Sequence, residues 1–393
     1  MDKRRSKAPR IALALAGGGP LGATYEIGTL CALEEAFDGV DFHRLQHYVG
    51  VSAGGFVAAA LANGVRPRQL WASFIEASGH EAEVFDPAWL LVPAYGEFVQ
   101  RAARLPWLAL SAAWQTARGR KPLTHLLERL GPALPTGVFS SEPVHHRLER
   151  IFSQPGRSND FRQLGTRLSL VATDLDSGES IAFGAPGWDH VPISRAVQAS
   201  SALPGLFPPV EIDGRSFVDG VLKKTMHASI ALEEGVDLML CINPLVPFHA
   251  SPRGIPRLAQ AGLPGVLSQA LRSLIHSRLE LRMKEYARSY PDTDILLFEP
   301  QASDPALYLA NTFGYRQRRE LAEHAYQQTR AMLLAQRATL APRLHRHGIT
   351  LRVDRLADAG RTLVAPRPKT RLATALADLR TTLDALDHQL QHA

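Results

Sequence analysis

Cysteine is scarce in this sequence: Cys31 and Cys241 are the two among 393 residues. This excludes the disulfide framework of small secreted proteins, and both thiols lie in apolar segments typical of a core. Such cysteine usage favours a reducing compartment. Neither cysteine lies in a cluster with metal-ligand spacing, and the adjacent pair His145 and His146 has neither the spacing nor the partners of a metal site. We therefore predict no metal and no cofactor.

Long uncharged apolar runs are also missing, since none reaches the roughly 18 residues that a bilayer-spanning helix needs. The N-terminus, MDKRRSKAPR followed by IALALA, mimics the start of a signal peptide. However, its apolar run over residues 11–16 is short for that purpose, and a glycine cluster follows it directly. We interpret this run as a buried first strand, and we expect a cytoplasmic location or peripheral attachment to the inner face of the membrane.

The composition is that of a globular protein, with 45% hydrophobic and 21% charged residues and a formal net charge of +6. Basic side chains gather at the start of the chain and in a late segment. They are Lys3, Arg4, Arg5, Lys7 and Arg10, followed by Arg343, Arg346, Arg352, Arg355, Arg361, Arg367, Lys369 and Arg371. Solvated surface and attraction to anionic lipid headgroups both fit this pattern. No recognised motif accompanies the charge, so nucleic acid is not predicted as a partner.

The first part of the chain alternates strands and helices, which indicates an α/β fold with a mostly parallel sheet. The pattern predicts a strand at 11–16, a helix at 21–37, a strand at 47–51 and a helix at 54–63. Further strands are expected at 168–173, 180–183, 210–212, 216–218, 237–242 and 295–298.

The composition and the pattern of apolar residues divide the sequence into three regions. Residues 9–245 form an α/β domain, 85–135 a helical insertion within it, and 246–393 a mostly helical C-terminal extension. The insertion holds Trp89, Trp107 and Trp114, which fit either ordinary core or contact with a lipid surface. The extension ends in a heptad leucine stripe of Leu372, Leu376, Leu379, Leu383, Leu386 and Leu390. This stripe fits either packing onto the protein's own body or a homodimer interface.

A glycine loop is the first motif that carries chemistry. Gly17, Gly18 and Gly19 follow the first predicted strand and open the first helix. Glycines leave backbone N–H groups accessible, and the helix N-terminus favours negative charge, so the loop could bind an anion. With Gly22, the loop also matches the G-x-G-x-x-G fingerprint of dinucleotide-binding proteins, and a purely structural turn is a third alternative.

The second motif is G-x-S-x-G, with Gly50, Ser52 and Gly54 between a predicted strand and a helix of small residues. In this context the serine occupies a strained turn that exposes its hydroxyl, and the following helix favours the anion formed on attack. Ser52 is therefore the candidate nucleophile.

The third motif is Asp219-Gly220 at the end of a predicted hairpin, whose turn is formed by Asp213-Gly214. Asp219 would point beyond the sheet, where its carboxylate could take the proton from Ser52 as a general base. His227 is the nearest histidine in sequence, and we interpret it as structural.

These motifs, in this order, resemble the patatin-like phospholipase family, of the bacterial type. The segment ASSALPGLFPPV at 199–210 is similar to the family's segment before the aspartate, so the resemblance spans about 9–245. It implies that 9–245 is the catalytic domain, whose site the insertion at 85–135 could cover. It implies a three-layer α/β/α fold, hydrolysis of acyl esters of lipids, a Ser52–Asp219 dyad without histidine, and no metal in the chemistry. Gly17, Gly18 and Gly19 would then form the oxyanion hole. The substrate would be a phospholipid, a lysophospholipid or an acylglycerol.

Two departures from the family pattern bear on substrate preference and turn geometry. Leu21 stands where the loop usually carries a basic residue, and Val221 stands where a second glycine commonly follows the aspartate. The alternative function is a lipid-binding or scaffolding protein that keeps the fold without turnover. A dinucleotide-binding oxidoreductase would explain only the glycine loop.

Overall fold

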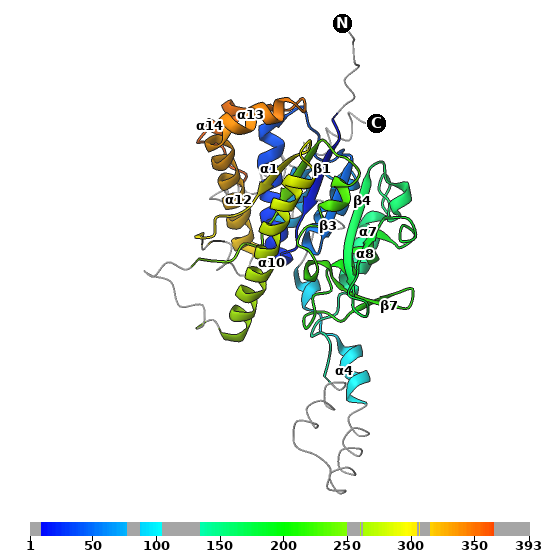
Figure 1. Cartoon of the computed structure of the whole chain (residues 1–393). Helices are drawn as coiled ribbons and strands as arrows, with labels where there is room; N and C mark the ends of the chain where they lie inside the picture. Colours follow the sequence, from blue (N-terminus) through cyan, green and yellow to red (C-terminus); the bar gives the residue numbers. More distant parts are fainter. Residues whose placement is uncertain are drawn as a thin grey trace.

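The computed structural model describes residues 9–76, 87–103, 134–249, 260, 262–304, 306 and 315–364. Its centre is a mixed sheet with the strand order β6-β7-β4-β3-β1-β8-β9, with β5 paired to β4 (Figure 1). The parallel strands are β1 (Ile11–Leu15), β3 (His47–Val51), β4 (Arg167–Asp174), β8 (Leu238–Ile242) and β9 (Asp294–Phe298). The antiparallel strands are β5 (Ser180–Phe183), β6 (Val210–Ile212) and β7 (Arg215–Asp219). This confirms the predicted mostly parallel sheet.

The central strands are buried on both faces, as their continuous apolar sequences require. Leu13 and Leu15 point into a core shared with α1 (Gly19–Ala36), α2 (Ala53–Ala62) and α12 (Tyr315–Ala335). Ala12 and Ala14 point into a second core on the opposite face, shared with α9 (Ser229–Leu232) and α10 (Gly262–Ser289). A sheet between two helical layers gives the α/β/α architecture that the resemblance implied.

The remaining elements complete these layers or connect them. They are α3 (Pro67–Leu70), η1 (Trp71–Ile75), η2 (Pro87–Leu91), α4 (Tyr95–Ala102), α7 (Glu142–Phe152), η4 (Phe161–Gln163), α8 (Ile193–Ser200), η5 (Gly220–Leu222), α13 (Arg337–His345) and α14 (Val353–Ala357). A second, two-stranded sheet joins β2 (Phe37–Asp38) to β10 (Thr350–Leu351). No helix among the described residues is both long and apolar enough to cross a membrane.

Helix α12 packs closely on α1, although the two are almost 300 residues apart. A Cβ atom at Gly28 would lie 2.4 Å from the carbonyl oxygen of Ala322, so only glycine allows this approach. The Thr329 hydroxyl donates to that of Thr29 at 3.2 Å. The outer layer on this face of the sheet is therefore built from both halves of the chain.

Parts of the predicted insertion and tail lie outside the described residues. Residues 85–86 and 104–133, with Trp107 and Trp114, are among them, as is the leucine stripe from Leu372 to Leu390. The described part of the insertion contains η2 and α4, which leave the body of the molecule at its lower end in Figure 1. Trp89 lies under the guanidinium group of Arg147, which is 4.8 Å from the ring centre. This tryptophan therefore packs against α7.

Candidate active site

Ser52 occupies a strained turn between β3 and α2, as the G-x-S-x-G pattern predicts. Its backbone has φ 53° and ψ −123°, a conformation that few residues other than glycine adopt. Glycines on either side allow the sharp turn. A Cβ atom at Gly50 would lie 2.6 Å from the Cα of Gly55, and one at Gly54 would lie 2.4 Å from the carbonyl oxygen of Ala16. The hydroxyl makes no capping bond to α2, so it is left for other partners.

Gly54 and its neighbour Gly55 provide a matched pair for testing this turn. Gly54→Ala is expected to lower the free energy of unfolding by about 1–3 kcal/mol or more, because the new methyl group meets the backbone of Leu15 and Ala16. Gly55→Ala meets nothing closer than Leu170 Cδ2 at 3.5 Å, and it is expected to stabilise α2 by up to about 1 kcal/mol. Denaturant unfolding of the two variants measures both effects. Equal destabilisation would show that the turn does not set the requirement for glycine.

Ser200 fixes the turn from the end of helix α8, a role that the sequence did not reveal. Its hydroxyl accepts a hydrogen bond from the Ser52 amide at 2.8 Å and donates one to the carbonyl oxygen of Val171 at 2.6 Å. Ser200 is fully buried at the end of α8. It thereby links the turn after β3 to the middle of β4.

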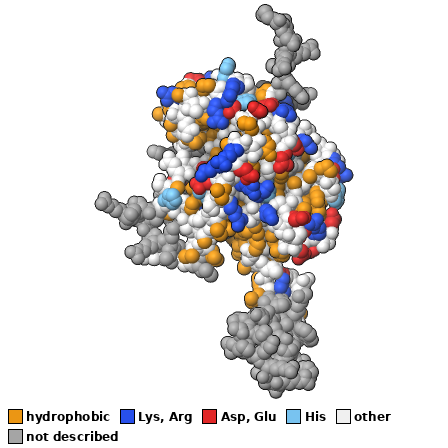
Figure 2. All heavy atoms as spheres, in the orientation of Figure 1, with side chains coloured by type: hydrophobic (Ala, Val, Ile, Leu, Met, Phe, Trp, Pro, Cys, Tyr) orange, Lys and Arg blue, Asp and Glu red, His pale blue; other side chains and the backbone are white. Residues whose placement is uncertain are grey.

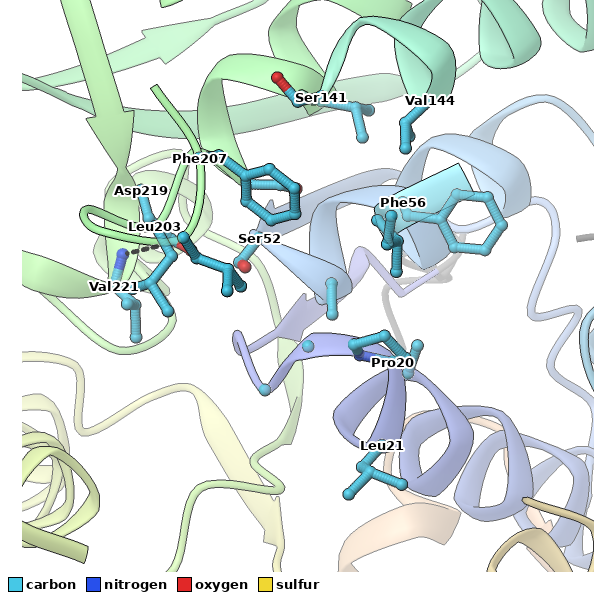
Figure 3. A pocket seen from close by; sticks show the side chains of 18 of the residues that line it. Pro20, Leu21, Ser52, Phe56, Ser141, Val144, Leu203, Phe207, Asp219 and Val221 are labelled. Carbon is cyan, nitrogen blue, oxygen red and sulfur yellow. Dashed lines mark hydrogen bonds between the residues drawn. The ribbon is translucent and has the colours of Figure 1, made fainter. Parts of the chain in front are cut away.

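Asp219 ends β7 and lies beside Ser52 (Figure 3), with 2% of its surface exposed. Its Oδ1 accepts the Val221 amide at 2.9 Å, and the Ser52 hydroxyl lies near enough to the carboxylate to lower its pKa. The chain passes close to β4 here, because a Cβ atom at Gly220 would lie 2.2 Å from the Val171 carbonyl oxygen. Since Val221 contributes its main-chain N–H, the bond does not require a glycine at that position. The structure thus brings the predicted nucleophile and base together.

The electrostatics of Asp219 suit a base near neutral pH. Burial raises the pKa of its carboxyl to about 6, against the opposing hydrogen bonds from Val221 and Ser52. His227 lies nearby on the same connection, with Nε2 at 3.3 Å from the carbonyl oxygen of Gly220. Burial lowers the pKa of His227 to about 4, so its imidazole is neutral at physiological pH. Its bond to the Gly220 carbonyl supports the structural role that we expected.

This pKa predicts opposite pH profiles for activity and stability. A general base must be ionised, so kcat/KM should rise about tenfold per pH unit below pH 6 and level off above it. The folded-state pKa exceeds the ordinary value of 3.8, so the associated stability is present at low pH and is lost as pH rises through about 6. The measurements are kcat/KM on a soluble ester and urea unfolding between pH 4.5 and 8. An activity midpoint near 4 would contradict the assignment.

The glycine loop forms the start of α1, next to Ser52. A Cβ atom at Gly17 would lie 3.2 Å from the Cβ of Ser52, and one at Gly18 would lie 2.8 Å from the Cα of Gly22. Gly19 has φ 61° and faces open space, with nothing within 4 Å of a Cβ atom there. No side chain caps this helix, and the first N–H groups of a helix have no partner within it. Gly18 and Gly19 therefore offer an anion site at the cavity wall, whereas Gly17 packs behind Ser52.

Ser52 and Asp219 open into a cavity of about 620 Å³ whose walls are mostly apolar (Figure 3). Leu21 forms part of the wall, at the position where the family loop usually carries a basic residue. The apolar lining comprises Phe56, Phe74, Leu90, Leu91, Phe139, Val144, Val197, Leu203, Leu206, Phe207, Leu245, Leu271 and Ile275. These residues come from both helical layers and from the loops above the sheet. The space is suited to an apolar chain.

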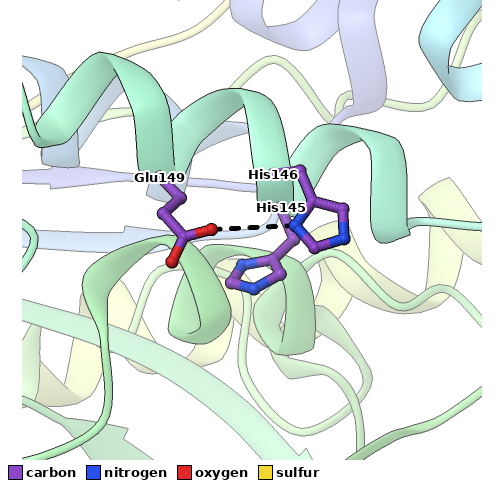
Figure 4. A group of neighbouring side chains, drawn as sticks. All are labelled: His145, His146 and Glu149. Carbon is purple, nitrogen blue, oxygen red and sulfur yellow. Dashed lines mark ion pairs between the residues drawn. The ribbon is translucent and has the colours of Figure 1, made fainter.

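The histidine pair on α7 has a partner that the sequence analysis missed. Glu149, one turn along the helix, places a carboxylate 3.7 Å from Nδ1 of His146, and ligand-type atoms of both histidines and Glu149 lie within 4.8 Å of one another (Figure 4). This corrects our expectation of no partner. The spacing remains wider than the roughly 3.3 Å between ligands of a tetrahedral zinc ion. None of the three side chains lines the cavity at Ser52.

Comparisons with known proteins agree with the geometry. The family model of patatin-like phospholipases matches residues 13–232. Uncharacterized NTE family proteins of Mycobacterium bovis and Mycobacterium tuberculosis are 28% identical over 291 residues, which cover 74% of this chain and 62% of theirs. This chain thus spans less than two thirds of the length of those relatives.

Two solved structures show a more distant similarity. VipD from Legionella pneumophila is 17% identical, with a TM-score of 0.38 and coverage of 83% of this chain and 67% of VipD. The type III effector ExoU is 16% identical, with a TM-score of 0.35 and coverage of 87% and 53%. The family assignment rests on the sequence match.

Proposed function

Because this chain belongs to the patatin-like phospholipase family, we propose that it cleaves acyl ester bonds of lipids with Ser52 as nucleophile and Asp219 as base. Membership supports a lipid hydrolase in general. The observation that carries the finer proposal is the Ser52 hydroxyl beside a buried carboxylate at the wall of an apolar cavity. The intact pair favours this function over lipid binding without turnover.

The proposed reaction has two steps, acylation of Ser52 and hydrolysis of the acyl-serine. Ser52 Oγ attacks the ester carbonyl while its proton passes to Asp219, and the oxyanion is stabilised by the Gly18 and Gly19 amides. The carbon–oxygen bond to the leaving alcohol then breaks, and that alcohol takes the proton from Asp219. Water, activated by the same carboxylate, cleaves the acyl-serine and restores the hydroxyl.

The proposal is tested by exposing a mixed lipid extract to the protein and to Ser52→Ala, followed by lipid mass spectrometry. We expect free fatty acids and their deacylated partners to appear only with the intact serine. The identity of the depleted lipids separates phospholipid, lysophospholipid and acylglycerol substrates. Equal lipid profiles with both proteins, across neutral and anionic lipids, would favour a non-catalytic lipid-binding role instead.

We also propose that an apolar rim at the mouth of the cavity meets the lipid surface. We define this rim as Leu91, Val92, Tyr95, Val99, Leu134, Val138 and Leu206, which are 37–69% exposed. Backbone hydrogen bonds from Ala94 to Val138 and from Val138 to Leu206 hold its segments together. Leu91 and Leu206 also line the cavity, so the rim is continuous with the site. Figure 2 shows hydrophobic side chains around the place where η2 and α4 leave the body.

Charged substitutions in this rim should separate surface binding from chemistry. Tyr95 and Val99 are each 69% exposed on one face of α4, so Tyr95→Asp/Val99→Asp should weaken vesicle binding at least about tenfold, at roughly 1–2 kcal/mol per lost apolar side chain. Activity on vesicles should fall in proportion, whereas activity on a short soluble ester should stay. Val353→Asp, an exposed apolar position on α14, is the matched control. Loss of activity on both substrates with a lower Tm would show that these residues support the fold instead.

A further inference from the structure

A second serine of this protein, Ser169, is hydrogen-bonded to the histidine–carboxylate pair of His47 and Glu234. This group lies at the opposite end of the central strands from Ser52. His47 is the first residue of β3, and Ser52 follows the last residue of the same strand. The two sites are therefore about 16 Å apart at roughly 3.3 Å per residue. Ser169 lies on the neighbouring strand β4.

The three side chains form a continuous hydrogen-bonded chain. Nε2 of His47 lies 2.9 Å from Oγ of Ser169, and Nδ1 of His47 lies 3.0 Å from Oε2 of Glu234, which follows α9. Oε2 of Glu234 also pairs with Nη1 of Arg167 at 2.9 Å, which fixes the carboxylate in place. Serine, imidazole and carboxylate thus stand in the relative order of a catalytic triad, which is identified by geometry and not by position in the sequence.

The partners of His47 determine its tautomer. An ionised carboxylate only accepts hydrogen bonds, so Nδ1 of His47 carries the proton that it donates to Glu234. Burial lowers the pKa of His47, against the opposing effect of Glu234, so the ring is neutral at physiological pH. Nε2 is then left with a lone pair that accepts the Ser169 hydroxyl proton. This is the state that a general base needs before a serine attacks.

A cavity gives access to these side chains. About 610 Å³ in volume, it is lined by His47, Ser169 and Glu234 together with Arg44, Gln46, Arg162, Thr166, Arg167 and Asp189, among others. Ser169 is 5% exposed, close to the 7% of Ser52. Oγ1 of Thr166, in the same lining, is buried and has no hydrogen-bond partner among the described residues. The polar lining contrasts with the apolar cavity at Ser52.

We propose that Ser169, His47 and Glu234 form a second nucleophilic serine site that takes small polar acyl esters. Ser169 Oγ bonds to the acyl carbon while its proton passes to His47 Nε2, and Glu234 stabilises the resulting imidazolium. The ester carbon–oxygen bond breaks, and the leaving alcohol takes the proton from His47. Water then cleaves the acyl-serine with His47 as base. The site does not depend on the proposed role of Ser52.

The test uses the full chain carrying Ser52→Ala and diisopropyl fluorophosphate, a small reagent that phosphorylates activated serines with release of fluoride. We expect one covalent adduct by intact mass, mapped by peptide sequencing to Ser169. Adding Ser169→Ala should abolish it, and adding Glu234→Gln should slow it at least tenfold. Adding Ser216→Ala is the matched control, because that hydroxyl pairs with Glu211 without a histidine. Labelling should then be unchanged.

Two labelling results would contradict a second serine site. A Ser52→Ala protein with native circular dichroism and no adduct after hours, under conditions that label wild-type Ser52, would overturn the proposal. So would an adduct that persists in Ser52→Ala/Ser169→Ala. A cysteine provides a second measurement: Ser169→Cys should be alkylated by iodoacetamide at least tenfold faster than Ser216→Cys at pH 7, because His47 favours the thiolate. Equal rates would overturn the proposal without relying on turnover.

Discussion

Ser52→Ala is expected to lower kcat for ester hydrolysis by on the order of 10⁴- to 10⁶-fold, the loss typical of removing a serine nucleophile. Asp219→Asn should cost a similar factor, since the amide cannot take the serine proton but still accepts the Val221 N–H. Both variants should fold, because neither change alters the volume of the buried site substantially. The measurement is kcat on a soluble p-nitrophenyl ester, with circular dichroism as the check on folding.

The double variant distinguishes a functional pair from two independent contributions. Because Ser52 and Asp219 share one proton, Ser52→Ala/Asp219→Asn should be hardly slower than either single variant. If the two losses multiplied instead, the residues would act separately. A fully active Ser52→Ala protein would eliminate the mechanism. Slow residual hydrolysis that disappears with Ser169→Ala would be assigned to the second serine site.

The second large effect is expected at the glycine loop. Gly19→Ala should reduce kcat about 100- to 1,000-fold, the usual loss of one oxyanion donor. Alanine resists the observed φ of 61°, and a relaxed φ would reorient the peptide groups of the loop that would bind the oxyanion. Space is not the obstacle, since nothing lies within 4 Å of a Cβ atom at Gly19.

Gly64→Ala is the control for backbone strain alone. Gly64 has φ 80°, also with nothing within 4 Å of its Cβ position, and it follows α2 away from the cavity. Its alanine variant should lose comparable stability, about 1–2 kcal/mol, with kcat unchanged. If Gly19→Ala also keeps wild-type kcat, the loop has a structural role only. The comparison is made from kcat and the midpoint of urea unfolding.

Much of this fold could be predicted because local patterns agree with the final packing. The apolar runs predicted as strands at 11–16 and 237–242 are buried on both faces, and the structure places them as neighbours β1 and β8. Ser52 and Asp219 were identified because glycine spacing marks the turns that present them. In both cases the signal lies within a few residues of the group that it positions.

Features that depend on distant parts of the chain could not be predicted in this way. Ser200 supports the Ser52 turn across 148 residues, and a buried serine in a helix carries no local sign of that role. The contact between Gly28 and Ala322 and the short pairing of β2 with β10 are equally distant in sequence. Glu149 is a local exception, because it lies one helical turn from His146. Its position follows from the spacing of α7.

The close packing of α12 on α1 bears on how this protein could be divided or recombined. Sequence similarity to the family extends over residues 13–232, yet Gly28 inside that range is shaped to receive the carbonyl of Ala322 outside it. A fragment cut at the limit of similarity would lose β8 and β9 and would expose the apolar face of α1 to water. Transplanting this domain into a chimera, or trimming it by proteolysis, would therefore have to keep the chain at least to the end of α12 at Ala335.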